Sequence, residues 1–225
     1  MTKQIRPVAV IHTDFPEPFG IPRQSVFCKE LTGTVVLEPD FQKDGILKGL
    51  EQFSHLWLIW GFSESPNGEN TVTVRPPRFG GNVSVGVFAS RSPIRPNGLG
   101  LSVVKMEGIR RDTRYGMVID VSGADLMDQT PIYDIKPYIP YSDSIPDASN
   151  GFACTESVSL TVEIPSYLEE TIPETKRKAL RSVLASDIRP GYQHDNAHVY
   201  HLSFAGFTIS FQIKNDQTVV VTDIT

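Results

Sequence analysis

The stretch LSVVKMEGIRRDTRYGMVIDV, residues 101–121, holds two runs of apolar and β-branched residues on either side of a short charged segment. Runs of this kind, bounded by Gly, Pro or Asp, are typical of β-strands. Six further runs of the same type occur before residue 164: VAVIHT (8–13), TGTVVLE (32–38), HLWLIWGF (55–62), TVTVR (71–75), SVGVFAS (84–90) and SVSLTVE (157–163). Closely spaced strands without intervening long helices predict an antiparallel sheet or barrel rather than a doubly wound α/β fold.

The pattern changes after residue 164. Residues 164–187 are helical in pattern and interrupted at Pro173, and three alternating runs follow: HVYHLSF (198–204), GFTISFQI (206–213) and TVVVTDI (218–224). We therefore predict a mostly β domain over residues 1–164 and a small α+β appendage over residues 165–225. One short helix is expected in the first domain at residues 44–53, where Ile46, Leu47 and Leu50 recur at helical spacing.

The composition is that of a globular protein. Of the 225 residues, 40% are hydrophobic and 21% are charged, which is ordinary for a chain that buries a core. The N-terminus lacks the apolar run of a signal peptide and no run reaches membrane-spanning length, so we expect a cytoplasmic protein without a membrane segment. Cys28 and Cys154 show no metal-ligand spacing, which argues against a disulfide framework and against a metal site.

Basic residues are concentrated in one segment of an otherwise acidic chain. The net charge is −5, yet residues 70–106 contain no Asp or Glu. The basic residues of that segment are Arg75, Arg78, Arg91, Arg95 and Lys105. This asymmetry predicts a local anion-binding site, with uneven surface charge as the alternative. The binding site is favoured because four of the five cations are arginines.

The loop SRSPIRPNGLGLS, residues 90–102, has a backbone shaped by prolines, which fix φ, and by glycines, which permit positive φ. The sequence GLGLSV begins as G-x-G, but Val103 occupies the position of the third glycine and the motif opens a strand rather than a helix. A Rossmann dinucleotide motif is therefore excluded, and the chain contains no P-loop, HExxH or GxSxG sequence.

Residues 125–147, DLMDQTPIYDIKPYIPYSDSIPD, combine five aspartates with four prolines and three tyrosines. Prolines at this density suppress helix and favour an extended chain. Tyrosines on such a chain offer faces on which nucleic-acid bases could stack. The alternative is a structured loop that covers one end of a barrel.

Five motifs taken together resemble one family. They are PRQ (22–24), SHLW (54–57), RPPR (75–78), GVFASRSPIRPNGLGLS (86–102) and DLMDQTPIYDIKPYIPYSDSIPDA (125–148). They are similar, in colinear order over residues 5–165, to the TsaA-like family, also called TrmO. The resemblance implies a β-barrel methyltransferase fold unrelated to the Rossmann type, S-adenosylmethionine as cofactor, and a homodimer. The implied substrate is N6 of threonylcarbamoyladenosine next to the anticodon of threonine tRNA.

The resemblance also implies site residues. The cofactor-binding residues would be Pro22, Arg23, Gln24, His55, Leu56, Arg91, Leu101, Asp128, Gln129, Thr130 and Pro131. The family usually has glycine at the position of Gln129, so a turn that needs positive φ would be strained in this chain. The candidate catalytic residues are Asp134 and Tyr138, either of which could assist proton removal, and Asn97. The expected RNA-binding residues are Arg75, Arg78, Arg95, Lys136, Arg177 and Arg181.

Two other functions remain open at the level of the sequence. The chain could be a non-catalytic RNA-binding barrel that has lost cofactor affinity, for example through Gln129. It could also be a methyltransferase of the same fold that acts on another modified nucleoside or on a small molecule. Cofactor binding separates the first alternative from the leading hypothesis, and nucleoside analysis of tRNA separates the second.

Overall fold

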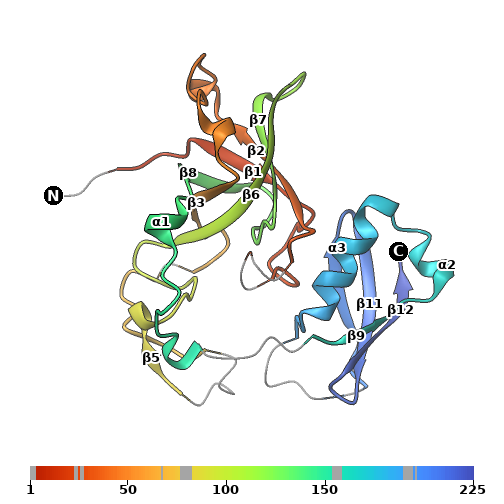
Figure 1. Ribbon diagram of the computed structural model, residues 1–225. Helices are drawn as coiled ribbons and strands as arrows, with labels where there is room; N and C mark the ends of the chain where they lie inside the picture. Colours follow the sequence, from red (N-terminus) through yellow and green to blue (C-terminus); the bar gives the residue numbers. More distant parts are fainter. Residues whose placement is uncertain are drawn as a thin grey trace.

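Six antiparallel strands form the first half of the structure. The computed structural model describes residues 4–22, 25, 28–66, 68–76, 83–153, 159–189, 195 and 197–225. The six strands are β1 (Ala9–His12), β2 (Thr32–Leu37), β3 (His55–Gly61), β6 (Leu99–Asp112), β7 (Gly116–Ser122) and β8 (Thr130–Pro137). They follow the order β1-β2-β7-β6-β3-β8, and β8 also pairs with β1, so the ring closes into a barrel (Figure 1).

The stretch 101–121 forms most of the β6–β7 hairpin. The two strands pair from Lys105 opposite Ser122 to Asp112 opposite Gly116. The carboxylate of Asp112 accepts hydrogen bonds from the backbone amides of Arg114 (2.8 Å) and Tyr115 (3.1 Å), which closes the turn. The hairpin tip and the segment 39–52 project together at one end of the barrel (Figure 1).

The barrel interior is filled by alternate residues of its strands, as period-two side-chain geometry requires. Leu56 and Leu58 of β3, for example, are fully buried while their neighbours are not. The same core contains Ala9, Ile11, Val35, Leu37, Val104, Ile119, Val121, Ala124, Leu126 and Ile132. Burying side chains of this size contributes roughly 1.5–3 kcal/mol for each of the larger ones.

A second, four-stranded sheet follows in the chain. It has the order β10 (Tyr200–Phe204), β11 (Phe207–Lys214), β12 (Thr218–Ile224) and β9 (Thr161–Glu163), with β9 parallel to β12. The helices α2 (Ser166–Glu169) and α3 (Glu174–Ala185) accompany it, and α3 buries Ala179, Leu180, Val183 and Leu184 in the core of this half. Strand β9 lies before residue 164, the predicted end of the first domain. It nevertheless belongs to the second sheet, because its three residues pair with β12.

Side chains from the barrel half take part in the second core. Phe15, Cys28 and Leu31 are buried in the same cluster as α3 and the second sheet. Lys176 of α3 donates to the carboxylate of Asp14 (2.6 Å) and to Thr32 Oγ1 (3.2 Å). The two halves of the structure are therefore packed against each other through both apolar and ionic contacts.

The mostly β fold predicted from the sequence is confirmed, but three local expectations are corrected. The helix expected at 44–53 is a series of turns ending in the 3-10 helix η3 (Leu50–Gln52), because Gly45 and Gly49 adopt φ of 84° and 89°. The run 71–75 gives only the two-residue strand β4 (Thr73–Val74). The run 84–90 gives only β5 (Val85–Gly86), followed by the 3-10 helix η5 (Val87–Ala89). The short helix α1 (Pro140–Asp143) follows β8.

Candidate functional site

A cavity of about 680 Å³ lies beyond the end of β3 and the start of β6. We call it the Arg91 pocket. Its lining residues are Pro18, Ile21, Pro22, Ser25, Trp57, Trp60, Gly61, Phe62, Ser63, Glu64, Ser65, Phe88, Ser90, Arg91, Pro93, Arg95, Gly100, Leu101, Ser102, Val103, Asp125, Leu126, Met127 and Thr130. The antiparallel register explains the meeting of these segments, because Gly61 of β3 lies opposite Leu99 of β6.

Glycine allows an indole ring to form one wall of the Arg91 pocket. A Cβ at Gly100 would lie 2.3 Å from Trp60 Cε2, so the indole occupies the space that a side chain at residue 100 would need. Trp60 Nε1 donates to Ser102 Oγ at 3.0 Å, which fixes the ring in this position. The facing loop is braced in turn, since the Arg95 guanidinium donates to the backbone carbonyl of Ser90 at 3.1 Å.

A buried carboxylate belongs to the same wall. Asp125 Oδ1 is buried and has no hydrogen-bond partner within the described part of the chain. Burial raises the pKa of Asp125, against the opposing effects of hydrogen bonds from Ser102 and the Ser25 backbone and of the positive charge of Arg91. A buried acceptor without a partner is costly, so this oxygen is suited to a donor or cationic group of a ligand.

The turn before β8 is held from the outside of the Arg91 pocket. Asp128 Oδ1 accepts from the backbone amide of Thr13 (3.1 Å) and lies 3.0 Å from His12 Nδ1, whereas Met127 and Thr130 line the pocket. Gln129 has φ of 62°, so this turn does need the left-handed conformation that glycine adopts most easily. A non-glycine residue in that region costs roughly 1–2 kcal/mol.

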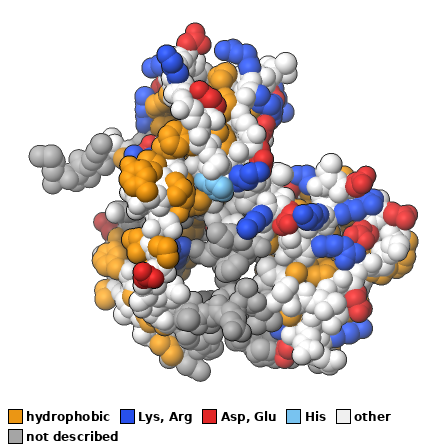
Figure 2. All heavy atoms as spheres, in the orientation of Figure 1, with side chains coloured by type: hydrophobic (Ala, Val, Ile, Leu, Met, Phe, Trp, Pro, Cys, Tyr) orange, Lys and Arg blue, Asp and Glu red, His pale blue; other side chains and the backbone are white. Residues whose placement is uncertain are grey.

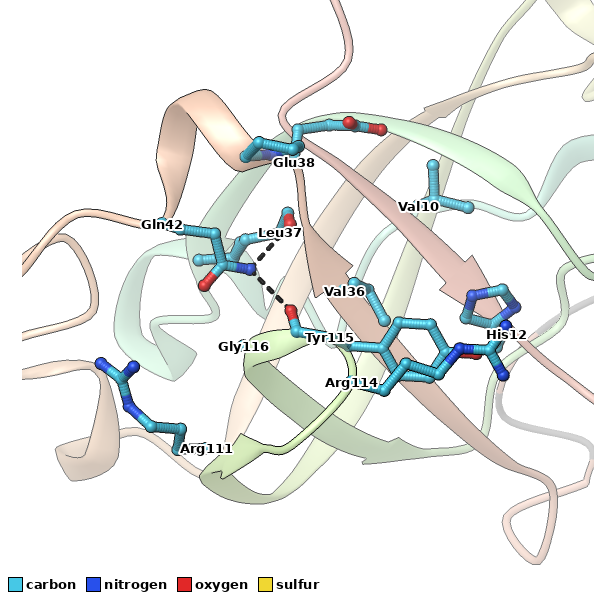
Figure 3. A pocket seen from close by; sticks show the side chains of 11 residues that line it. Val10, His12, Val36, Leu37, Glu38, Gln42, Arg111, Arg114, Tyr115 and Gly116 are labelled. Carbon is cyan, nitrogen blue, oxygen red and sulfur yellow. Dashed lines mark hydrogen bonds between the residues drawn. The ribbon is translucent and has the colours of Figure 1, made fainter.

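A second cavity, of about 510 Å³, lies against β1, β2 and the tip of the β6–β7 hairpin (Figure 3). We call it the Tyr115 groove. Its lining residues are Val10, His12, Val36, Leu37, Glu38, Pro39, Gln42, Arg111, Arg114, Tyr115 and Gly116. Gln42 ties two walls together, because its Nε2 donates to the carbonyls of Leu37 (2.8 Å) and Tyr115 (2.9 Å), as the dashed lines in Figure 3 show. None of the site residues predicted from the sequence lines this groove.

Comparisons with known proteins identify the family. The family model described as the tRNA-methyltransferase O N-terminal domain matches residues 10–144. The chain belongs to this family. The tRNA (adenine(37)-N6)-methyltransferase of Escherichia coli is 35% identical over 224 residues, which cover 94% of each chain. A solved structure of TrmO from Pseudomonas aeruginosa is 32% identical with a TM-score of 0.82, and the match covers 100% of this chain and 97% of that one.

The predicted resemblance to the TrmO family is thereby confirmed, and with it the assignment to a family of methyltransferases. A further Pseudomonas aeruginosa relative, 40% identical over 200 residues, is named for S-adenosylmethionine-dependent methyl transfer. That match covers 86% of this chain and 84% of the relative.

The structure gathers some of the cofactor-binding residues predicted from the TrmO resemblance and separates others. Pro22, Arg91, Leu101 and Thr130 line the Arg91 pocket, while Asp128, Gln129 and Pro131 belong to the adjoining turn and strand without lining it. Arg23 and Gln24 lie outside the described residues.

His55 and Leu56 do not reach the Arg91 pocket. They begin β3 and lie opposite Lys105 and Val104, whereas the pocket adjoins the far end of the strand. Leu56 is fully buried inside the barrel. The residues that the structure places at the pocket are instead Ser63 and Glu64, in the loop just after the apolar run 55–62.

None of the candidate catalytic residues lines the Arg91 pocket. The ring of Tyr138 packs on Trp57, which lines the pocket, with 5.7 Å between the ring centroids. Asp134 pairs with Lys136 at 3.1 Å and is half exposed. Asn97 is exposed on the loop that leads into β6.

The predicted RNA-binding arginines fall into two groups. Arg75 is exposed after β4, and Arg95 lines the Arg91 pocket, while Arg78 lies outside the described residues. On α3 the arginines are engaged within their own half: Arg181 binds both carboxylate oxygens of Glu169 (2.6 and 2.7 Å), and Arg177 donates to the carbonyl of Ile172 (2.9 Å). Lys136 is held by its ion pair.

Sequence reasoning missed Trp60, Ser63, Glu64 and Asp125 as pocket residues. The signal for Ser63 and Glu64 was their place directly after a long apolar strand, where loops commonly carry function. Asp125 belongs to the proline- and tyrosine-rich segment 125–147, but its interactions with Ser25, Arg91 and Ser102 join residues that are distant in the sequence. Among the described residues, no cluster of His, Cys, Asp or Glu could hold a metal ion, and no helix in the described ranges is long and apolar enough to cross a membrane.

Proposed function

We propose that this protein transfers a methyl group from S-adenosylmethionine to N6 of threonylcarbamoyladenosine next to the anticodon of threonine tRNA. Family membership supports methyl transfer to tRNA, and the match extends over nearly the whole Escherichia coli enzyme. The observation that carries the proposal is the Arg91 pocket, in which a buried carboxylate, an arginine and aromatic side chains meet.

The residues of the Arg91 pocket fit this cofactor. Its volume of about 680 Å³ lies within the range of roughly 300–1,000 Å³ that is usual for small-molecule sites. We propose that Arg91 pairs with the cofactor's carboxylate and that Asp125 Oδ1 accepts from its ammonium or hydroxyl groups. Leu101 and the Trp60 ring would cover the apolar parts. The bound cofactor supplies an electrophilic methyl group.

The chain's own contribution is mainly positioning. Holding two reactants in line removes much of the entropic barrier to a bimolecular reaction. Trp57 Nε1 donates to Asp143 at 2.9 Å, and this bond ties α1 to the wall of the pocket. We propose that Tyr138, packed on Trp57, or Asp134 assists proton removal from the nitrogen, and that Asn97 contacts the RNA beside it.

We further propose that Arg75, Arg78 and Arg95 bind tRNA phosphates near the Arg91 pocket. Lys136, Arg177 and Arg181 are proposed as weaker contacts, because ion pairs or carbonyl hydrogen bonds already engage them. Residues 1–164 would then carry the reaction and residues 165–225 would form a supporting domain. A role on tRNA implies action in the cytoplasm.

A homodimer is proposed as the working form. Several large apolar side chains near the Arg91 pocket are exposed, including Val72, Phe88 and Leu101. Figure 2 shows hydrophobic surface gathered on the side that carries α1 and β5. Exposed patches of clustered apolar side chains commonly mark protein–protein interfaces. Two-fold symmetric dimers are the commonest form of assembly. Light scattering at micromolar concentration should report twice the chain's mass, and a monomer would contradict the dimer.

The test of the proposed function is nucleoside mass spectrometry on tRNA from a deletion strain. The N6-methylated threonylcarbamoyladenosine should be absent and should return on complementation with this protein. Return of a different methylated nucleoside would favour the same reaction on another substrate. No methylated product, together with tRNA binding and no cofactor binding, would favour a non-catalytic RNA-binding module, which the strained Gln129 turn would then explain.

A further inference from the structure

We propose that the Tyr115 groove binds a tRNA nucleotide close to the one that is methylated. The proposal rests on the proposed tRNA methyl transfer and adds a second RNA-binding subsite to the Arg91 pocket. It is carried by the groove's composition, by the positive charge of Arg111, which makes no ion pair within the described residues, and by the contact of His12 in the groove with Asp128 beside the Arg91 pocket.

The groove combines apolar floor residues with flat side chains. Val10 and Val36 lie at its base, and the rings of His12 and Tyr115 are 5.4 Å apart at one side (Figure 3). The Arg114 guanidinium lies 4.9 Å from the centre of the Tyr115 ring. Single-stranded bases stack on aromatic rings and on guanidinium planes in this way, largely without regard to base identity.

The hairpin tip also carries cations that can bind phosphate. Arg110 is engaged by Asp112 and Asp120. Arg111, in contrast, is exposed and makes no ion pair within the described part of the chain. Figure 3 shows Arg111 on the opposite side of the hairpin tip from Arg114. Glu38 is the one carboxylate in the lining, and it could accept hydrogen bonds from the amino group of a base.

Three basic side chains of α3, unlike Arg111, already have acidic partners within the described part of the protein. Lys176 is bound to Asp14, Lys178 to Glu30 and Arg181 to Glu169. These cations stabilise the packing of the second half of the structure. A polyanion would have to displace existing partners there, whereas Arg111 in the Tyr115 groove is available without such a cost.

The Tyr115 groove adjoins the Arg91 pocket through a few residues. His12 lines the groove and lies 3.0 Å from Asp128, while Thr130, two residues further along, lines the pocket. Two residues of extended chain span at most about 7 Å. An RNA whose modified nucleotide is at the pocket therefore has the groove within reach of its neighbouring nucleotides.

The experiment compares tRNA binding by Arg111→Gln, Arg114→Gln, Tyr115→Leu and the triple variant with the wild type. The matched control is Lys214→Gln, which removes an equally exposed cation at the end of β11. Fluorescence anisotropy gives the dissociation constant for tRNA over a series of salt concentrations, and calorimetry gives that for S-adenosylmethionine. Thermal melting establishes that each variant is folded.

Tyr115→Leu should weaken tRNA binding by about five- to hundredfold, as expected for loss of one stacked base. Each arginine variant should flatten the plot of log affinity against log salt by about 0.7–0.9 per lost phosphate contact. Cofactor binding and the Lys214→Gln control should remain at wild-type values. If Tyr115→Leu does not fold, Arg111→Gln still tests the proposal, because the Arg111 side chain is exposed and makes no ion pair with any residue that the structure describes.

Unchanged tRNA affinity and salt dependence in Arg111→Gln and the triple variant would overturn the proposal. Calorimetry with adenosine monophosphate supplies a second criterion. If the triple variant loses binding of this nucleotide but keeps its tRNA affinity, the groove serves a free nucleotide and the proposal is overturned. Failure of the proposed function is separate. It would appear as wild-type protein that binds tRNA but leaves it unmethylated, a result that is measured without any variant.

Discussion

The Arg91 pocket and the Tyr115 groove are linked through the contact of His12, which lines the groove, with Asp128, which lies in the turn beside the pocket, yet their walls differ in kind. The pocket is lined by indole and phenyl rings and contains the buried carboxylate of Asp125. The groove is lined by Gln42, which hydrogen-bonds to both of its walls, and by arginines at the tip of a hairpin. Burial makes Asp125 selective for one ligand group, whereas the exposed cations of the groove suit a long polyanion that is held by many weak contacts.

Removing the Arg91 guanidinium gives the largest expected effect on ligand binding. Arg91→Ala should weaken S-adenosylmethionine binding by roughly ten- to hundredfold, or about 1.5–3 kcal/mol, because a charge-assisted pair is lost. Calorimetry measures this directly. Arg111→Ala is the matched control, since it removes the same charge from the groove and should leave cofactor affinity unchanged. Wild-type affinity in Arg91→Ala would remove this residue from the cofactor site.

A methyl group at Gly100 should disturb the pocket wall. Gly100→Ala places a Cβ 2.3 Å from the Trp60 ring and forces the indole away from Ser102. We expect a loss of about 1–3 kcal/mol in the free energy of unfolding, as for other overpacked sites, together with weaker cofactor binding. Gly108→Ala on the same strand is the control, because no atom lies within 4 Å of a Cβ there. Equal stability of the two variants in urea would argue against this packing.

The raised pKa of Asp125 predicts a pH dependence of both stability and binding. Because burial raises the pKa of the Asp125 carboxyl above its ordinary 3.8, the folded protein holds, between pH 3.8 and that raised pKa, a proton that the unfolded chain has released. The associated stability is fully present below pH 3.8 and is lost as pH rises through the higher folded pKa. Asp125→Asn should remove this fall in the free energy of unfolding as pH rises, which urea denaturation at several pH values would measure.

Cofactor affinity should move in the opposite direction if a cationic group binds to Asp125. Binding needs the carboxylate, so affinity should fall as pH is lowered through the raised pKa of Asp125. Titration calorimetry at several pH values should show this slope in the wild type and a flat, weaker response in Asp125→Asn. The same slope in the variant would assign the pH dependence to another group.

The smallest effect is expected at the turn 127–130 beside the Arg91 pocket. Gln129→Gly should stabilise the protein by about 1 kcal/mol, because glycine adopts positive φ without strain. For a chain of this size that corresponds to roughly 2–4 °C in Tm. Asn215→Gly, at φ of 53° in another turn, is the control and should gain less, since asparagine tolerates this region better than glutamine does. A drop in Tm for Gln129→Gly would mean that the glutamine side chain stabilises the turn.

The sequence predicted those features that depend on local pattern. The run 55–62 is continuously apolar and forms β3, and the runs at 198–224 form three strands of the second sheet. The prediction of a helix at 44–53 was wrong, because the spacing of apolar residues does not show that Gly45 and Gly49 adopt positive φ. Local pattern therefore identified the strands better than it identified their interruptions.

Features that depend on long-range register could not be read in this way. Which end of β3 meets the Arg91 pocket follows from the pairing of Gly61 with Leu99, and this register is not visible in the sequence. His55 and Leu56 lie away from that pocket, and their role in cofactor binding stays a prediction. Partners across helices were equally hidden, as with Glu169, which binds Arg181. The Asp125 carboxyl interacts with Ser25, Arg91 and Ser102, which are distant in the sequence, so its environment has no local signature.

The most direct test of the central claim is a crystal structure of the protein with S-adenosylhomocysteine. The account predicts that the ligand occupies the Arg91 pocket, with its carboxylate at Arg91 and one of its donors within about 3.2 Å of Asp125 Oδ1. A ligand bound in the Tyr115 groove, or one in the pocket that leaves Asp125 Oδ1 without a partner, would contradict it.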